Sequence, residues 1–315
     1  MIPAASIVIP AYNAVAFLGD AISSAQQQTL REIEIIIVDD ASTDATWEVI
    51  QAAAGRDPRI RPLRRSRRGG PSAACNSGFG QATGRWIALL DADDLFLPER
   101  LERLIRHAET MQADLIADNL LQRDFATGAD LGPHLRAPWI FDPEPLSLLE
   151  MLRRDRPDAG PHEKLGYVQP IKRREFLAGS GVRFAEDVGA GEDFLHYFEC
   201  VAKGARFHLV PEAHYVYRVR RGSVSNGRPV AHHFSAANRR MYDIAARIGA
   251  RDVMAVLRQR QLMLDYSSFE EAVQAGNYAA ALRFAHPWPL SHALSQLRIL
   301  LRHAESRRGK PAPAR

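Results

Sequence analysis

The sequence predicts an α/β fold in which an open, mostly parallel β-sheet is flanked by helices. Three short runs of β-branched and aliphatic residues, at 6–12, 33–40 and 86–93, lack the alternation of polar and apolar residues that marks a half-exposed strand. Continuous apolar strands are typical of a sheet covered on both faces, and such sheets are normally parallel. Helical segments separate the runs, so strand and helix alternate as a parallel sheet requires.

Helices are expected between and after these strands. Their predicted ranges are 14–28, 43–54 and 71–81, and Ser42 is the N-cap candidate of the second. A further helix at 99–111 leads to a strand at 113–121, and residues 123–160, rich in Pro, Gly and Asp, predict long loops around a short helix at 146–154. Next come helices at 172–177 and 191–203 and strands at 206–211 and 214–220. From 232 the pattern is helical, and the last ten residues are expected to be disordered.

Composition indicates an ordinary globular protein. With 315 residues, of which 46% are hydrophobic and 25% charged, the chain can bury a core of one large domain or two closely packed ones. The two cysteines, Cys75 and Cys200, lie far apart and are expected to be reduced. No basic residue precedes the short apolar stretch at the N-terminus, and no window approaches the roughly 18 to 20 apolar residues of a spanning helix. We therefore expect a cytoplasmic protein.

The charge pattern leaves two kinds of partner open. The net charge is only +4, but arginines are bunched at 61–68, at 218–221 and near the C-terminus, which suits phosphate-bearing ligands or anionic membranes. A basic nucleic-acid-binding protein is the alternative, because such runs neutralise phosphates. Interleaved surface aromatics or a known reading motif would then be expected, and the sequence has neither. We therefore expect no nucleic-acid partner.

Polar residues follow all three predicted strands, and ligands of open α/β sheets bind beyond the carboxyl ends of the strands. The third strand ends in Asp91, Asp93 and Asp94. On an extended strand residues i and i+2 face the same side, so Asp91 and Asp93 are expected to point together into a cleft, where Mg²⁺ or Mn²⁺ or ribose hydroxyls would offset their repulsion. The alternative is a solvated acidic turn in which Asp94 caps a helix.

Four motifs in this order carry a family resemblance. The chain resembles a family 2 (GT-A fold) glycosyltransferase over about 6–225 in the motifs SIVIPAYNA, IEIIIVDDASTDAT, GGPSAACNSGFGQATGRWIALLDADD and GEDF. Its overall sequence is also similar to bacterial enzymes of succinoglycan-type exopolysaccharide assembly. The resemblance implies a GT-A type sheet with a C-terminal helical extension. It also implies inverting transfer of a sugar, such as glucose, from UDP to a hydroxyl of a saccharide or polyprenyl-diphosphate-linked acceptor, with peripheral membrane contact as a further expectation.

The donor-binding residues follow from matching positions. Pro10 and Tyr12 resemble the residues that hold the base, with Tyr12 stacking on uracil, and Asp40 matches the acceptor for the uracil imide N–H. A strand-terminating turn and a helix cap are the competing interpretations. Asn76 matches a donor-contacting helix position, although this chain has Cys75 where the family usually has arginine. Asn76 is therefore expected to offer hydrogen bonds only.

The resemblance also implies the chemistry. Asp91 matches the acid near ribose or metal, and Asp93 the direct ligand of Mg²⁺ or Mn²⁺. Inverting displacement needs a carboxylate to take the acceptor proton. Asp193 matches that base, and Glu192 is expected to orient the acceptor. The alternative is an acidic first helical turn, which the helix dipole favours.

A loop after the last predicted strand completes the expected site. Arg218 and Ser223 resemble an arginine and a serine that close over the donor phosphates, and Arg220 or Arg221 could replace Arg218. The resemblance divides the chain into a nucleotide-sugar-binding half at 1–98, an acceptor-binding and catalytic half at 99–231, and a helical extension at 232–315. A nucleotidyltransferase of related fold is disfavoured, because PAYNAVAFLG lacks a Gly-rich basic loop.

Overall fold

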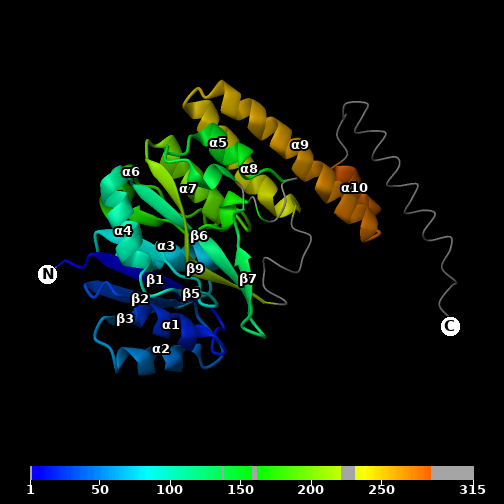
Figure 1. Ribbon diagram of the computed structural model, residues 1–315. Helices are drawn as coiled ribbons and strands as arrows, with labels where there is room; N and C mark the ends of the chain where they lie inside the picture. Colours follow the sequence, from blue (N-terminus) through cyan, green and yellow to red (C-terminus); the bar gives the residue numbers. More distant parts are fainter. Residues whose placement is uncertain (1, 137, 158–161, 163, 221–230, 285–315) are drawn as a thin grey trace, which may run out of the picture.

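Nine strands form one mixed sheet in the part of the computed structural model that is described, namely residues 2–136, 138–157, 162, 164–220 and 231–284 (Figure 1). The strand order is β3-β2-β1-β4-β8-β6-β9-β5, and β7 pairs with β6. The strands are β1 (Ala5–Ala11), β2 (Ile33–Asp39), β3 (Ile60–Arg64), β4 (Trp86–Leu89), β5 (Leu95–Phe96), β6 (Leu115–Asp124), β7 (Asp130–Pro133), β8 (Ile171–Arg173) and β9 (Phe207–Val219). The predicted α/β class is confirmed.

Helices occupy most of the sequence between the strands. They are α1 (Leu18–Gln26), α2 (Thr46–Ala54), α3 (Pro71–Gln81), α4 (Arg100–Met111), α5 (Leu148–Arg153), α6 (Arg174–Ser180), α7 (Glu192–Ala202), α8 (Ala231–Arg247), α9 (Arg251–Gln274) and α10 (Tyr278–Arg283), with short 3₁₀ turns η1 (Pro138–Phe141) and η3 (Leu165–Tyr167). None of the helices in these described ranges combines the length and apolar character needed to cross a bilayer.

The strands that carry the predicted site run in one direction. β2, β1 and β4 pair in parallel, and β3 extends this group. The short β8 is antiparallel to both β4 and β6, so β6 and its parallel partner β9 point the same way as β4. The carboxyl ends of β1, β2, β4, β6 and β9 therefore meet at one edge of the sheet.

Both faces of the sheet are covered, as the continuous apolar strands predict. Alternate residues of β1 face opposite sides, so Ile7 and Ile9 join one buried cluster and Val8 joins another. The first cluster packs against α1, α2 and α4, and the second against α3, α5, α7, α8 and α9. In Figure 1, α1 and α2 lie on the opposite side of β1–β3 from α5, α7 and α8.

The C-terminal helices share the second cluster with the rest of the fold. Ala237 of α8 and Leu257 of α9 are buried together with Phe194 and Phe198 of α7. Arg260 of α9 forms a buried ion pair with Asp155 (2.8 Å). The helical extension is confirmed, whereas its boundary at 231/232 and the boundary at 98/99 stay predictions. The expected disorder of the last ten residues concerns a part of the chain outside the described ranges.

Two helices begin later than predicted, because the preceding backbone donates to side chains of the neighbouring loop. The Ala14 N–H donates to Thr46 Oγ1 (2.8 Å), and α1 starts only at Leu18. Ser42 is not the N-cap of α2: its Oγ accepts from the Asn13 N–H (3.0 Å), and the helix starts at Thr46. These bonds tie together the loops that follow β1 and β2.

Some strands differ from the prediction. The helix expected at 172–177 begins at Arg174, and its first residues belong to β8, which fills the gap between β4 and β6. The two strands expected at 206–211 and 214–220 are one strand, β9, with irregular pairing opposite Asp118 and Asn119. Strand β3, with Pro62 at its centre, was not predicted from the sequence; proline is tolerated there because β3 is an edge strand.

Candidate active site

The acidic residues after β4 lie in a turn rather than on an extended strand. β4 ends at Leu89, and the Asp94 N–H donates to the Asp91 carbonyl (3.0 Å). The prediction that Asp91 and Asp93 face the same side because they lie on an extended strand is therefore wrong, since β4 ends before them. The two acids still interact within the turn, since the charge of Asp93 raises the pKa of Asp91.

Asp94 is a buried anchor and does not cap a helix. The Tyr215 hydroxyl donates to Asp94 Oδ2 (2.9 Å), and the Arg218 N–H donates to Oδ1 (2.8 Å). The same hydroxyl lies 3.3 Å from Asp91 Oδ2. These bonds fasten the acidic turn to the last residues of β9. Tyr215 was missed in the sequence, because an alternating HYVYRVR strand gives no sign of which tyrosine faces the acids.

Burial and repulsion between like charges raise the pKa values of Asp91 and Asp94 in this turn. Burial, followed by the charge of Asp93, raises the pKa of Asp91 to about 7. Burial also raises the pKa of Asp94, and the charge of Asp91 adds to the effect. Carboxyl groups that share a poorly solvated site resist simultaneous ionisation, and a cation that binds between them would offset this cost.

The predicted base lies at the start of α7, on the other side of the sheet edge. Gly191 precedes the helix with φ 77°, and Glu192 and Asp193 form its first turn. A Cβ at Gly191 would come within 2.9 Å of Phe234, so glycine is required both by the backbone conformation and by the approach of α8. Burial, then the charges of Glu192 and Asp91, raises the pKa of Asp193 well above its usual value. Burial also raises the pKa of Glu192.

The structure brings Asp193 and Asp91 together through a residue that was not predicted from the sequence. Gln169, which precedes β8, donates from Nε2 to Asp91 Oδ2 (3.5 Å), and its side chain also lowers the pKa of the nearby Asp193 carboxyl. A lone glutamine in the run GYVQP carries no motif signal. Its position becomes visible only when β8 is inserted between β4 and β6.

Arg218, near the end of β9, and Arg220, just after the strand, have different neighbours. Arg218 is buried, and its guanidinium donates to Asp20 Oδ2 (2.7 Å) and to the Asp93 carbonyl. Arg220 forms an ion pair with Asp93 Oδ2 (3.3 Å), and both side chains are about one-third exposed or less, at 32% and 28%. Arg220 is thus the arginine beside the predicted metal ligand. Ser223 lies outside the described residues, as does the alternative Arg221.

Tyr12 and Asp40 lie at the ends of β1 and β2 and both contact the arginine-rich loop. The Arg68 guanidinium stacks over the Tyr12 ring, 4.0 Å from its centroid. Asp40 is buried and accepts from Arg65, from the Gly69 N–H (3.0 Å) and from the Gly70 N–H (2.7 Å). The predicted base-binding residues are therefore adjacent to one loop, 65–70, which Asp40 fastens to the sheet.

Pro10 and Asn76 complete the list of expected donor residues. Pro10 is partly exposed near the end of β1, in register with Val38. Asn76 is buried on α3, where it donates to the Phe184 carbonyl (2.9 Å) and to Glu186 (2.9 Å) and accepts from the Phe184 N–H (2.9 Å). Its amide thus anchors the segment that leads to Glu192, which favours a positioning role over donor contact.

A buried lysine lies behind the acidic residues. Lys172 of β8 is 0% exposed, donates to the Pro170 carbonyl (3.2 Å) and has the rings of Phe79, Phe184 and Tyr197 within 5.2 to 5.9 Å. Burial lowers its pKa to about 8, while the charge of Asp193 acts in the opposite direction. Lys172 also acts on the pKa of Cys75, the position where the family usually has arginine. Lys172 therefore supplies positive charge behind the acids in a chain that lacks that arginine.

The carboxylates fit a metal that is shared with a diphosphate. Within the described ranges, no group of three or more His, Cys, Asp and Glu residues could hold a metal ion by itself. Mg²⁺ typically uses one or two carboxylates together with substrate phosphates, rather than a cage made only of protein ligands. Asp93 and Asp91, both partly exposed, offer the oxygens that such a site needs.

A separate cavity lies at the opposite edge of the sheet, far from these acids. Its volume is about 790 Å³, and it is lined by the starts of β1 and β4, including Ala4 and Trp86. Its basic side chains have partners in the protein: Arg85 pairs with Glu109, Arg173 pairs with Asp114 (3.5 Å), and Arg174 donates to the Gly84 carbonyl (2.9 Å). The cavity is therefore not part of the candidate active site.

Comparison with known proteins agrees with this geometry. A model of the glycosyl transferase family 2 matches residues 6–166. Succinoglycan biosynthesis protein ExoO of Rhizobium meliloti is 37% identical over 226 residues, which is 71% of this chain and 63% of that protein. Succinoglycan biosynthesis protein ExoU of the same organism is 32% identical over 70% of this chain and 63% of that protein. The matches thus span somewhat less than two-thirds of the length of these relatives.

Solved structures share the fold at low sequence identity. Staphylococcus aureus TarS residues 1–349, in complex with UDP-GlcNAc, superimposes with a TM-score of 0.71 at 18% identity, covering 89% of this chain and 79% of that chain. The mannosyltransferase PcManGT of Pyrobaculum calidifontis, in complex with GDP-Man and Mn²⁺, gives 0.54 at 18% identity, covering 97% and 87%. The GT-A sheet and the sequence match agree: this chain belongs to the glycosyl transferase family 2.

Proposed function

We propose that this chain is a metal-dependent, inverting glycosyltransferase that moves a sugar from a UDP-sugar to a hydroxyl of a saccharide or lipid-linked oligosaccharide. The observation that carries the proposal is that Asp193, at the start of α7, interacts with Asp91 in the acidic turn after β4, which also contains Asp93. The charge of Asp91 and the Gln169 side chain both act on the pKa of Asp193. Two acids suit a diphosphate–metal site, and the third suits a base that faces an acceptor.

The proton transfer can be followed on this chain's own residues. Asp193 takes the proton of the attacking hydroxyl as its oxygen bonds to the anomeric carbon, and the bond from that carbon to UDP breaks. Burial and the charges of Glu192 and Asp91 raise the pKa of Asp193 in the protein alone, and a cation bound beside Asp91 would favour the carboxylate form that a base needs. Glu192, next in the chain, is proposed to orient the acceptor. A single displacement from the face opposite UDP inverts the anomeric configuration.

The departing diphosphate gathers negative charge, and positive groups aimed at it lower the barrier. Asp93, with Asp91, would hold a Mg²⁺ or Mn²⁺ ion, which neutralises that charge when bound. Arg220, paired with Asp93 at 3.3 Å, is the described arginine best placed to join the phosphates. Arg218 already binds Asp20 and the Asp93 carbonyl, so we assign it to positioning the turn.

UDP as the nucleotide and glycan synthesis as the setting are supported by the relatives. The two Rhizobium relatives bear names from succinoglycan biosynthesis, and the TarS structure holds UDP-GlcNAc. We accordingly propose a role in exopolysaccharide or cell-surface glycan synthesis at the cytoplasmic side of the membrane. The nucleic-acid-binding and nucleotidyltransferase alternatives are not favoured, because neither explains the family match together with the acid cluster.

A donor screen tests this function. UDP release is measured for UDP-glucose, UDP-galactose, UDP-N-acetylglucosamine and UDP-glucuronate, with Mn²⁺ and with EDTA. The proposal predicts metal-dependent release from one or more of these donors. No turnover of any UDP-sugar, combined with salt-sensitive nucleic-acid binding that UDP does not affect, would favour the alternative.

A further inference from the structure

Gln169 contacts acids from two separate parts of the site. It is 4% exposed, its Nε2 donates to Asp91 Oδ2 (3.5 Å) after β4, and its side chain lies close enough to Asp193 on α7 to lower the pKa of that carboxyl. A primary amide has two N–H donors and can therefore serve two carboxylates at once.

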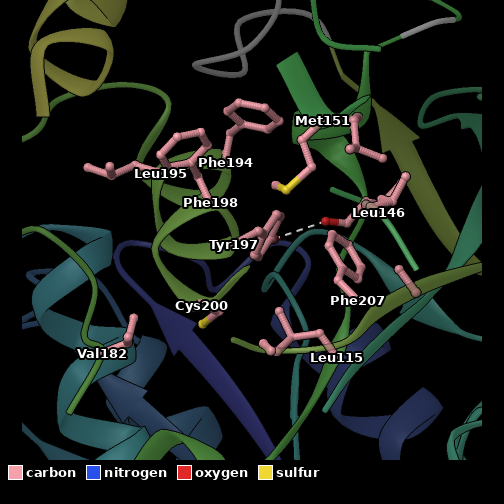
Figure 2. Close-up of a cluster of buried hydrophobic side chains, with 14 of the residues drawn as sticks. Leu115, Leu146, Met151, Val182, Phe194, Leu195, Tyr197, Phe198, Cys200 and Phe207 are labelled. Carbon is pink, nitrogen blue, oxygen red and sulfur yellow. Dashed lines mark hydrogen bonds between the residues drawn. The ribbon is translucent and has the colours of Figure 1, made fainter. Parts of the chain in front are cut away.

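The orientation of this amide is held from behind. The Tyr197 hydroxyl lies 3.0 Å from Gln169 Oε1 and 2.9 Å from the Val168 carbonyl. Tyr197 of α7 is buried in the hydrophobic cluster that also contains Phe194 and Cys200, as Figure 2 shows. With the amide oxygen facing this hydroxyl, the NH₂ end of Gln169 faces the carboxylates.

The backbone of Gln169 is held as firmly as its side chain. The Arg100 guanidinium donates to the Gln169 carbonyl (2.6 Å) and forms a fully buried ion pair with Asp118 (2.8 Å). Charge-assisted hydrogen bonds in a buried network are strong and directional. The position of the Gln169 amide is therefore fixed by contacts other than those with Asp91 and Asp193.

We propose that Gln169 is a positioning residue that fixes Asp193 relative to Asp91, so that the acceptor base and the donor diphosphate site meet at one reaction centre. The charge of Asp91 disfavours ionisation of Asp193, and the Gln169 amide acts in the opposite direction. The inference rests on the proposed glycosyl transfer. It adds a residue that touches neither donor nor acceptor and acts through the two acids.

The test compares two buried glutamines in the full-length protein. Gln169→Met keeps the chain length and apolar stem but removes the NH₂ group. Gln28→Met is the matched control, because Gln28 is 0% exposed and bonds only backbone atoms, at Leu97 and Leu101. UDP release is measured with the donor that the parent protein uses in the screen, together with UDP affinity and thermal stability.

We expect Gln169→Met to lower kcat by about 10 to 100-fold, the usual effect of removing a supporting hydrogen bond behind a reactive group. KM for the donor should change little, and Gln28→Met should lower stability without this loss of kcat. In an Asp193→Asn background, Gln169→Met should cost little more, because both changes act on one group. A folded Gln169→Met protein with parental kcat, or fully additive losses in the double variant, would overturn the inference.

Tyr197→Phe provides a second route if Gln169→Met does not fold. It frees the oxygen end of the amide without opening a cavity, so kcat should fall while UDP affinity is kept. A folded Tyr197→Phe protein with parental kcat overturns the inference. Failure of the parent protein to use any UDP-sugar counts instead against the proposed function, so the two failures are distinguishable.

Discussion

Arg220 lies 3.3 Å from Asp93, so the carboxylate expected to bind a metal has an arginine as its partner in the protein alone. Cation and arginine therefore compete for Asp93, and a bound ion would release the guanidinium toward the donor phosphates.

We expect Asp93→Ala to abolish the gain in UDP affinity that Mn²⁺ provides. UDP affinity in EDTA should be retained, because the variant removes the carboxylate and leaves the Arg220 guanidinium in the site. Calorimetric titration with UDP, with and without Mn²⁺, measures both values. Asp187→Ala, which removes an exposed acid paired with Arg240 (2.5 Å), is the control. Undiminished Mn²⁺-dependent affinity in Asp93→Ala would remove Asp93 from the metal site.

The raised pKa of Asp91 predicts how stability depends on pH without metal. The pKa is about 7 in the folded protein against an ordinary 3.8, so the folded state binds more protons than the unfolded state between these values. The contribution of Asp91 to the free energy of unfolding is therefore full below about pH 4 and is lost as pH rises through 7. In urea unfolding with EDTA, the free energy of unfolding should decline less from pH 5 to 8 in Asp91→Asn than in the parent protein. Equal declines in the variant and the parent protein would contradict the raised pKa of Asp91.

Asp40 anchors the loop that covers Tyr12, and its replacement should weaken nucleotide binding. In Asp40→Asn an NH₂ group replaces one of the oxygens that accept from Gly69 and Gly70, which loosens the loop and removes the proposed acceptor for uracil. We expect UDP affinity to fall about tenfold, equivalent to ~1.4 kcal/mol, as for loss of a charge-assisted hydrogen bond. Arg65→Met, which spares both glycine contacts, should have the smaller effect. UDP binding by Asp40→Asn at parental affinity would exclude Asp40 from the nucleotide site.

Lys172 predicts a pH effect at the alkaline end. Its pKa is about 8 in the folded protein against an ordinary 10.5, so between these values the folded state binds fewer protons than the unfolded state. The penalty for burying the ammonium is therefore full below pH 8 and is relieved as pH rises to 10.5. The free energy of unfolding of the parent protein, minus that of Lys172→Met, should increase across this window by at most about 3 kcal/mol. A constant difference would show that Lys172 titrates normally.

Local patterns predicted the strands and helices whose signals do not depend on distant partners. The helix Pro71–Gln81 has its expected bounds, β1 is shifted by one residue toward the N-terminus, and β2 ends one residue earlier than predicted. The starts of α1 and α2 were wrong, because Asn13 and Ser42 bond each other's loops across 29 residues. A single-sequence pattern does not carry that pairing.

The same distinction applies to the site. Asp91, Asp93, Glu192 and Asp193 could be selected from motifs, because acids follow a strand or open a helix. Gln169 and Tyr215 could not, since they reach the acids only through β8 and β9, and the insertion of β8 between β4 and β6 has no local signal. Arg220 was predicted only as a substitute for Arg218. The sequence does not show which of two arginines separated by one residue pairs with Asp93.

The rate of Asp193→Asn tests the central claim most directly. The substitution keeps the size and hydrogen-bonding reach of the side chain but removes its ability to accept a proton, so UDP affinity and the fold should survive. With the donor that the parent protein uses, kcat should fall by about 10² to 10⁴-fold, the usual contribution of a positioned general base. The loss should appear in kcat rather than chiefly in KM. A folded Asp193→Asn protein that turns over the donor at nearly the parental rate would contradict the account, because no proton would then pass to Asp193.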